Sequence, residues 1–299
     1  MNDVVIIGSG IAGLTCAIYL GRAGFKPIVI CGNSPGGQLT KTNLVENYPG
    51  FPEPILGVDL MMRIMDQTTK FGTEFIYDNV LAVSTNRIVT LASGKMMPAS
   101  AILIATGCTH NKLSIPGEAE FANKGVSWCA TCDGAFYKNK KVAVVGGGNV
   151  AVMEALFLAS LASEVLLIHR RDMLKADKTE QGKVFNNRKI KCVWNSEVIK
   201  ILGNNKLHSI EIHNIKDGKT YEEQIDGLFI AVGTHPTTDF VKGVIDLDGE
   251  GYIIANNTKT SVEGIYAAGD CVSGSLKQAV YAAGQGALAS RVIQKQLIS

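Results

Sequence analysis

Two short apolar runs in the chain each end in a glycine-rich stretch. Residues 4–7 (VVII) lead into GSGIAG at 8–13, and residues 142–145 (VAVV) lead into GGGNVA at 146–151. Apolar positions with helical spacing follow both stretches. A continuous apolar run of this length is typical of a parallel strand that is buried on both faces of its sheet. The pattern therefore predicts an α/β protein that contains two copies of a strand, a turn and a helix.

The glycines of these turns suit a dinucleotide. They permit a tight turn and a close approach of the backbone to a pyrophosphate, which lies at the positive end of the following helix. The alternative is that such turns only allow close packing and bind nothing, but the expected strand and helix flank the motif both times. We therefore expect two Rossmann-like dinucleotide-binding domains. The candidate residues are Gly8, Ser9, Gly10 and Gly13 in the first turn, and Gly146, Gly148, Asn149 and Ala151 in the second.

A later strand of each unit is duplicated as well. Residues 101–107 (AILIATG) and 227–233 (GLFIAVG) are apolar and end in small residues, about where a Rossmann-like unit closes. The segment 264–270 (GIYAAGD) precedes a helical pattern from about 277 to 293 and follows no glycine fingerprint of its own. We therefore expect this segment to return to the first unit and complete it.

This chain order inserts the second domain into the first. The expected boundaries are 1–112 and 239–299 for the first domain and 113–238 for the inserted domain. Pro116 and Pro236 interrupt the hydrophobic pattern near the two crossings.

The end of the second strand in each unit indicates which nucleotide is bound. In an NAD site an acidic residue about 20 residues after the glycines binds the ribose hydroxyls. In the second unit residues 165–171 read VLLIHRR, with no acid at the strand end. Two guanidinium groups could pair bidentately with a 2′-phosphate, so we expect this unit to prefer NADPH to NADH. The alternative is a solvated basic turn, which is common on protein surfaces.

Composition and charge narrow the class of protein. The chain has 299 residues, 46% of them apolar and 19% charged, which suits two folded domains. The net charge of +2 gives no broad field that favours nucleic acid or an anionic membrane. No apolar stretch approaches the roughly 18–20 residues of a membrane span, and the N-terminus lacks the basic region of a signal peptide. We expect a cytoplasmic protein.

Two of the seven cysteines stand apart from the others. Cys129 and Cys132 are separated by two residues, a spacing that allows a disulfide, and the other five cysteines are scattered singly. Such a pair in a cytoplasmic protein is more often redox-active or metal-binding than structural. Zinc is the alternative, because Cys108 and His110 lie upstream and would complete a set of four ligands. That spacing is tighter than usual for zinc and no second C-x-x-C is present, so redox chemistry is favoured.

Several motifs together resemble those of the low-molecular-weight, bacterial-type thioredoxin reductases. They are GGQL at 36–39, VENYPG at 45–50, CATCDG at 129–134 and AGD at 268–270. The resemblance spans nearly the whole chain. It implies FAD in the first domain, NADPH in the inserted domain, thioredoxin as the protein substrate, and a homodimer.

The resemblance also assigns cofactor-binding residues. It implies flavin contacts at Gly8, Gly10, Gly13, Gln38, Asn47, Thr106, Asp270, Gln278 and Ala279. Further cofactor-binding candidates beside these are Gly37, Gly107, Gly269 and Lys277, with Gly233 in the inserted domain. The NADPH motif of the family, His-Arg-Arg-x-x-x-Arg, is matched at His169, Arg170 and Arg171 and departs at Lys175. Lysine keeps the positive charge but lacks the planar fork of arginine.

The resemblance further implies the roles of three residues around the dithiol. Cys132 is the thiolate that engages the flavin, Cys129 attacks the partner disulfide, and Asp133 shuttles a proton. Asp133 could alternatively be a turn residue before Gly134. Because the NADPH fingerprint and the dithiol share the inserted segment and both must reach one flavin, we expect that segment to rotate about its crossings. A fixed arrangement with the two groups on opposite faces of the flavin is the alternative.

Three other functions fit parts of the pattern. A flavin-dependent small-molecule dithiol oxidase would keep the flavin and the dithiol but would not need Arg170 and Arg171. A reductase of ferredoxin or flavodoxin would need no pair of cysteines. A zinc-stabilised nucleotide sensor without turnover would be colourless when purified, whereas a protein with oxidised flavin is yellow.

Overall fold

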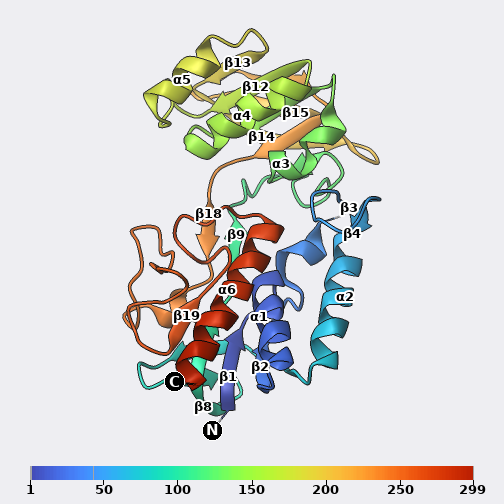
Figure 1. The fold of residues 1–299 in the computed structure, drawn as a ribbon. Coiled ribbons are helices and arrows are strands. Elements are labelled where there is room, and N and C mark those ends of the chain that lie inside the picture. The colour runs from blue at the N-terminus through green and yellow to red at the C-terminus, as the bar shows by residue number, and fades with distance from the viewer. Residues whose placement is uncertain (1, 43, 299) are drawn as a thin grey trace. The chain divides into compact units, whose positions relative to one another are not determined.

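The computed structural model describes residues 2–42 and 44–298. The chain folds into two compact units (Figure 1), Met1–Thr109 with His235–Ser299 (unit 1) and His110–Thr234 (unit 2). The chain crosses between the units at 109/110 and 234/235. These positions lie a few residues before the boundaries expected from the sequence, 112/113 and 238/239.

Parallel strands form the centre of unit 1. The sheet order is β5-β2-β1-β8, with β19 pairing in parallel to β8, and the antiparallel strands β7 and β6 extend it. The strands are β1 (Asn2–Ile7), β2 (Pro27–Ile30), β5 (Glu74–Ile76), β6 (Val80–Val83), β7 (Ile88–Leu91), β8 (Met96–Ile104) and β19 (Ile265–Ala267). The pairing of β19 with β8 confirms that the C-terminal segment returns to complete the first unit.

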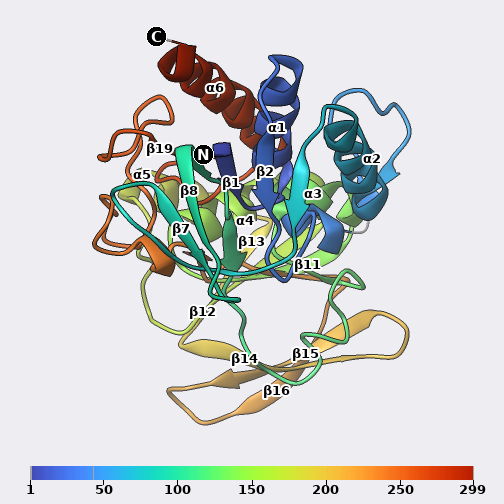
Figure 2. The same cartoon turned by 90° about the horizontal axis from the view of Figure 1, so that it is seen from below.

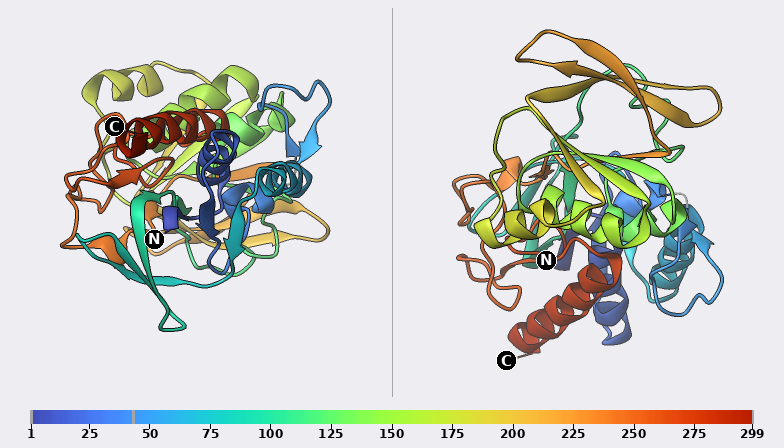
Figure 3. Two further views of the ribbon diagram at one scale, coloured as in Figure 1. Left: turned by 60° about the horizontal axis from the view of Figure 1, so that its bottom comes forward. Right: turned by 90° about the horizontal axis from the view of Figure 1, so that it is seen from above.

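Alternate residues of β1 build the two cores of unit 1. Val4 and Ile6 pack against helices α1 (Ile11–Arg22) and α6 (Ala279–Ile298), whereas Val5 and Ile7 pack on the opposite face. Helix α2 (Gly57–Lys70) also contacts α1. Figures 2 and 3 show α6 beside α1, and a Cβ at Gly286 of α6 would lie 2.1 Å from the carbonyl oxygen of Ala12. Glycine therefore allows the close approach of these two helices.

The last helix differs from its expected range. We expected it from about 277 to 293, and α6 spans Ala279–Ile298. Lys277 has a φ of 57°, which a right-handed helix does not allow, so the helix begins after it.

Unit 2 contains a second parallel sheet, in the order β10-β17-β11-β12-β13. Its strands are β10 (Val126–Ser127), β11 (Lys141–Val145), β12 (Glu164–His169), β13 (Ile190–Trp194) and β17 (Gly227–Ile230). Val142 and Val144 pack against α4 (Asn149–Leu161) and α5 (Lys178–Phe185). Ala143 and Val145 face an antiparallel sheet of β14 (Ser196–Gly203), β15 (Leu207–Asn214) and β16 (Thr220–Gln224), so the sheet lies between two layers (Figure 3).

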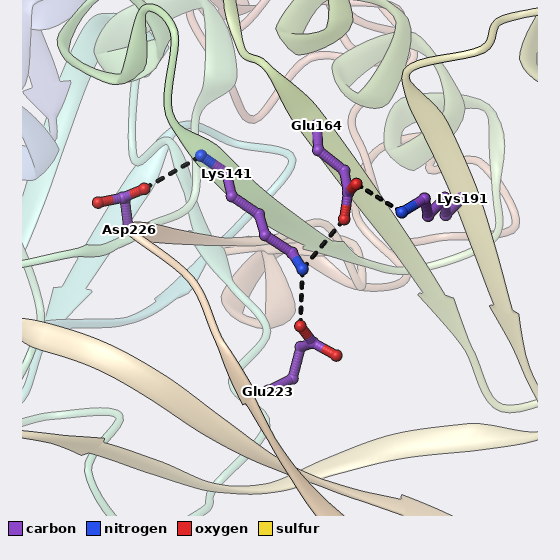
Figure 4. A network of polar contacts seen from close by, with 5 residues as sticks. All are labelled: Lys141, Glu164, Lys191, Glu223 and Asp226. Carbon is purple, nitrogen blue, oxygen red and sulfur yellow. Dashed lines mark hydrogen bonds and ion pairs between the residues drawn. The ribbon is translucent and has the colours of Figure 1, made fainter.

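A charged network links the two sheets of unit 2 (Figure 4). The Lys141 ammonium lies 3.0 Å from a carboxylate oxygen of Glu164 and 2.7 Å from one of Glu223 on β16. Glu164 also pairs with Lys191 at 2.6 Å, and the Lys141 N–H donates to Asp226 at 3.0 Å. These side chains are partly solvated, so each pair contributes about 1 kcal/mol or less.

Short elements complete the two units. They are the helical turns η1 (Gly37–Lys41), α3 (Ala130–Asp133), η2 (Gly134–Tyr137) and η3 (Asp239–Val241), and the strands β3 (Leu44–Val45), β4 (Ile55–Leu56), β9 (Cys108–His110) and β18 (Thr234–Pro236). Strands β9 and β18 carry the two chain crossings and pair with each other. None of the helices in the described part of the chain has the length and apolarity that crossing a membrane requires.

Candidate functional site

The first glycine turn is packed so closely that two of its positions exclude any side chain. Gly8 has a φ of +111°, and a Cβ there would lie 2.3 Å from the Ala105 carbonyl oxygen at the end of β8. A Cβ at Gly13 would lie 2.1 Å from the carbonyl oxygen of Gly8. Real Cβ atoms do not approach this closely. Helix α1 can therefore pack against the strand ends only because these two positions are glycine.

Gly10 differs, because a Cβ there would meet no atom within 4 Å. It is the N-cap of α1, where no side chain caps the helix and no acidic residue lies in the first turn. The first N–H groups of a helix have no intrahelical partner, and together with the helix dipole they favour an anion. The open space and these donors fit a pyrophosphate.

Residues expected to bind the flavin cluster around this turn in unit 1. The Ser9 hydroxyl accepts the Gly36 N–H at 3.1 Å, and a Cβ at Gly37 would lie 3.0 Å from the Gly10 Cα. Gln38 donates its side-chain amide to the Cys108 carbonyl oxygen at 2.8 Å. The segment 36–38 is therefore folded onto the glycine turn.

The ends of the other strands bring further candidates together. A Cβ at Gly8 would lie 3.1 Å from the Cα of Thr106, whose hydroxyl donates to the Thr237 carbonyl oxygen at 2.6 Å. Gly107 follows with a φ of +67° and open space around it. The Asn47 amide donates to the Gln278 side-chain oxygen at 3.3 Å. Gln278 directly precedes Ala279, the first residue of α6.

Asp270 lies on the return segment of the chain, next to Gly269. Burial raises the pKa of the Asp270 carboxyl, and the positive charge of Lys277 partly offsets this. The Lys277 ammonium also donates to the Tyr252 hydroxyl at 3.1 Å. A Cβ at Gly269 would lie 3.0 Å from that of Ala12, so the segment reaches α1 closely.

The second glycine turn in unit 2 repeats the geometry of the first. Gly146 has a φ of +153°, and a Cβ there would lie 2.4 Å from the Ala231 carbonyl oxygen and 2.6 Å from the Ala151 Cβ. Gly148 is the N-cap of α4, has open space and has no side-chain cap. The side-chain oxygen of Asn149 accepts the Asp177 N–H at 2.8 Å. This turn therefore fits a second pyrophosphate.

The four basic residues of the expected NADPH motif divide into two groups. Arg170, Arg171 and Lys175 are exposed at the end of β12. His169 is buried, and a Cβ at Gly147 would lie within 2.3–2.6 Å of its ring atoms. Burial and the nearby Arg171 lower the pKa of His169, so the ring is neutral at pH 7. His169 thus packs beneath the turn, and the other three are free to meet a ligand phosphate.

Gly233 lies next to a chain crossing. It has a φ of +100°, and its carbonyl oxygen accepts the Asn111 N–H at 3.0 Å.

The two cysteines of the C-x-x-C motif form a disulfide, with a Cα–Cα distance of 5.3 Å. Cys129 is the N-cap of the short helix α3, and the Cys132 N–H donates to the Cys129 sulfur at 3.2 Å. Both cysteines are partly exposed. The zinc alternative required these sulfurs as separate thiolates, and they are bonded to each other.

Two carboxyl groups lie beside the disulfide in unit 2. Asp133 accepts a hydrogen bond from the Ser127 hydroxyl at 2.6 Å, and the same hydroxyl accepts the Cys129 N–H at 3.1 Å. Glu154 of α4 accepts the Ala130 N–H at 3.2 Å. The hydrogen bond from Ser127 gives Asp133 a defined place beside the cysteines.

Several residues of the site were missed from the sequence. Ser127 and Glu154 contact the disulfide turn, Gly36 binds Ser9, and Gly147 accommodates His169. For Gly147 a signal existed, because it lies between two expected glycines. Gly36 belongs to the GGQL motif at 36–39, whereas nothing in the local pattern indicated the contacts of Ser127 and Glu154.

Comparisons with known proteins agree on one family. A model described as "Pyridine nucleotide-disulphide oxidoreductase" matches residues 2–286. A thioredoxin reductase from Rickettsia felis is 46% identical over 304 residues, covering 99% of this chain and 98% of the relative. A solved thioredoxin reductase from Giardia duodenalis has a TM-score of 0.95 at 38% identity, covering 99% of both chains.

A second solved relative is equally similar in sequence but less similar in structure. The Lactococcus lactis thioredoxin reductase in its FR conformation is also 38% identical, covers 100% of this chain and 99% of its own, and has a TM-score of 0.67. The two solved relatives therefore differ from each other when the whole chain is superposed.

Proposed function

The chain belongs to the pyridine nucleotide-disulphide oxidoreductase family and acts as a thioredoxin-disulfide reductase, and we propose that it uses two cofactors. They are FAD in unit 1 and NADPH in unit 2. The observation that carries this function is a C-x-x-C disulfide in a chain with two open glycine turns. Neither the oxidase nor the sensor alternative accounts for the disulfide, both turns and the exposed arginines together.

FAD is proposed for unit 1 because this turn suits the pyrophosphate of a dinucleotide. Gly10 leaves the helix N-terminus open, and the carboxyl of Asp270 lies on the segment that reaches α1. Extraction of the cofactor from the purified protein, followed by mass spectrometry, tests this proposal. We expect FAD at about one molecule per chain, and FMN or no flavin would contradict it.

NADPH is proposed for unit 2 because its second strand ends in positive charge. Arg170 and Arg171 are exposed where an NAD site has an acid, and Lys175 lies nearby. The Lys175 N–H donates to the Gly147 carbonyl oxygen at 2.7 Å, which ties this basic segment to the glycine turn. A 2′-phosphate bound there would meet three cationic side chains.

Bound FAD would supply a two-electron relay between a hydride donor and a disulfide. The residues of the chain then perform the exchange with thioredoxin. In the reduced protein Cys129 attacks the thioredoxin disulfide, and Cys132 attacks the resulting mixed disulfide and releases reduced thioredoxin. Asp133, oriented by Ser127, is placed to hold a proton for the departing sulfur.

We further propose that unit 2 rotates during the catalytic cycle. The disulfide and the second glycine turn both belong to unit 2. We do not expect one placement of that unit to present both groups to the same flavin. Both chain crossings lie in the two-stranded ribbon of β9 and β18, and solved relatives of equal identity differ in TM-score. An engineered disulfide that locks the units should abolish multiple turnover, and undiminished turnover in a verified locked protein would contradict rotation.

The homodimer and the cytoplasmic location are also proposals. The homodimer rests on the family resemblance alone, and the cytoplasmic location rests on the sequence pattern of the chain. Analytical ultracentrifugation of the flavin-loaded protein should give twice the mass of one chain, and a monomer at micromolar concentration would contradict the dimer.

A further inference from the structure

Glu154 is a second carboxyl group beside the disulfide, and the proposed exchange gives it no role. It lies on α4, the helix that begins at the second glycine turn. One of its oxygens accepts the Ala130 N–H, across the contact between α4 and α3. Ala130 lies directly after Cys129, so this hydrogen bond joins the helix of the nucleotide turn to the first turn of the disulfide helix.

The other oxygen of the Glu154 carboxyl has no partner. It is buried and makes no hydrogen bond to any residue that the structure describes. Burial raises the pKa of Glu154 to about 7, and the Ala130 N–H only partly offsets this. An ionised carboxylate is costly in such a position, so the group changes its charge close to neutral pH.

We propose, on the basis of the proposed function, that Glu154 is a positioning residue for the redox dithiol: its carboxyl holds the first turn of α3 and, once ionised, opposes thiolate formation at Cys129. Asp133, by contrast, is bound by the Ser127 hydroxyl and is placed to handle protons directly.

The electrostatics follow from the hydrogen bonds of α3. The Cys132 N–H donates to the Cys129 sulfur at 3.2 Å, and such a donor stabilises a thiolate after reduction. A carboxylate at the neighbouring Ala130 N–H acts in the opposite direction, because like charges disfavour each other. Once the disulfide is reduced, a negative charge on Glu154 therefore opposes a negative charge on the Cys129 sulfur.

In the disulfide form, other titratable groups on the elements that pack against α4 do not shift the pKa of Glu154. These groups are Cys129, Cys132, Asp133, Tyr137, Lys141, Glu164, His169, Lys178, Glu180, Lys183, Lys191 and Cys192. Burial raises the pKa of Glu154, the Ala130 N–H lowers it, and no other group contributes to the shift. Replacing Glu154 therefore isolates one charge.

The test measures thiol reactivity and does not require thioredoxin. The flavin-loaded protein is reduced with dithiothreitol, freed of the reductant without oxygen, and alkylated briefly with iodoacetamide between pH 5.5 and 9. Mass spectrometry then gives the rate at Cys129 and at Cys132 separately. Glu154→Gln keeps an oxygen for the Ala130 N–H and removes the charge, whereas Glu154→Met removes both.

We expect Glu154→Gln to lower the midpoint pH of Cys129 alkylation by about one unit, the usual size of such a shift. A thiolate of lower pKa is less nucleophilic, so the variant should react about threefold faster near pH 7 and about threefold slower on the high-pH plateau. The control Glu180→Gln removes a partly exposed carboxylate that pairs with Lys183 and should match the wild type.

Two results would overturn the proposal. The first is a Glu154→Gln profile identical to that of the wild type. The second is a change in Glu154→Met alone, which would indicate a purely structural hydrogen bond. Reduction of thioredoxin is measured separately in the same preparations, so its failure would contradict the proposed function and leave the alkylation result interpretable.

Discussion

The two glycine turns of this protein share one backbone geometry and differ in what surrounds it. Gly8 and Gly146 both have positive φ values, and a Cβ at either would lie 2.3 or 2.4 Å from a carbonyl oxygen after the neighbouring strand. Between the glycines, unit 1 has Ser9, whose hydroxyl binds the segment at Gly36. Unit 2 has Gly147 in that place, with the His169 ring packed against it.

The shared turn suits binding of any dinucleotide, whereas the differing surroundings suit the choice between dinucleotides. The shared geometry presents helix N–H groups to a pyrophosphate and does not distinguish one dinucleotide from another. In dinucleotide-binding folds the residues after the second strand make that distinction, because they lie near the ribose of the nucleotide. Unit 1 continues there into the loop that folds back on Ser9, and unit 2 continues into Arg170 and Arg171. Unit 2 also carries the disulfide.

Removing either sulfur should have the largest effect and should affect unit 2 alone. In Cys129→Ser and Cys132→Ser we expect thioredoxin reduction to fall by about 10³-fold or more, because the exchange requires two sulfurs. The FAD content of unit 1 should stay unchanged. Cys192→Ser, a free cysteine in the same unit, is the control and should keep full activity. Retained turnover with thioredoxin in either variant of the pair would contradict the proposed dithiol–disulfide exchange.

Adding one methyl group to each turn tests whether the two are equivalent. Gly8→Ala and Gly146→Ala should each cost about 2–4 kcal/mol of unfolding free energy, because both strain the backbone and overlap a carbonyl oxygen. Gly8→Ala should also lower the FAD content, whereas Gly146→Ala should weaken NADPH binding.

Matched controls separate strain from overlap. Gly24 in unit 1 and Gly218 in unit 2 have positive φ values but open space around them. Their alanine variants should cost only about 1–2 kcal/mol in chemical unfolding. Equal losses in all four variants would show that close packing at the turns contributes nothing.

The double variant Arg170→Gln/Arg171→Gln tests the difference between the units. It should weaken NADPH binding by about 2–4 kcal/mol, since each charged hydrogen bond contributes about 1.5–3 kcal/mol and the two are not fully additive. NADH binding should change little. Arg188→Gln, in the same unit, is a control for net charge. An equal loss for both nucleotides would mean that the arginines do not read the 2′-phosphate.

The smallest effect is a pH dependence of stability that arises from Glu154. The unfolded chain releases this proton near pH 4.5, and the folded protein keeps it until pH is about 7. Stability should therefore fall between these values as pH rises, by about 1–3 kcal/mol after allowance for partial solvation. Glu154→Gln should lack this loss and be more stable than the wild type at pH 8, as urea unfolding at pH 5 and pH 8 would reveal. Parallel curves for the two proteins would contradict it.

Local sequence signals predicted the strands, the turns and the return of the last strand. A glycine-rich stretch between an apolar strand and a helix is a specific pattern. The turns at Gly8 and Gly146 could therefore be predicted at the correct residues. The start of the last helix was placed two residues too early, because the positive φ of Lys277 has no signature in residue type. The antiparallel sheet β14-β15-β16 was not predicted at all.

Side-chain contacts that depend on the tertiary fold could not be predicted from the sequence. Ser127 and Asp133 are near in sequence, yet only the fold brings the hydroxyl to the carboxylate. Glu154 follows Ala130 by 24 positions and reaches it because α4 packs on α3. His169 was expected to bind the nucleotide. Its ring is buried against Gly147, which follows the neighbouring strand β11, and this contact is not visible in the local sequence.

Electrons should pass from NADPH through the Cys129–Cys132 pair to a thioredoxin disulfide. The most direct measurement follows NADPH consumption and new thioredoxin thiols in the same anaerobic sample of purified protein. We predict two thioredoxin thiols for each NADPH consumed, in the wild type and not in Cys129→Ser. NADPH consumption without new thioredoxin thiols, or none at all in the flavin-loaded protein, would contradict the account.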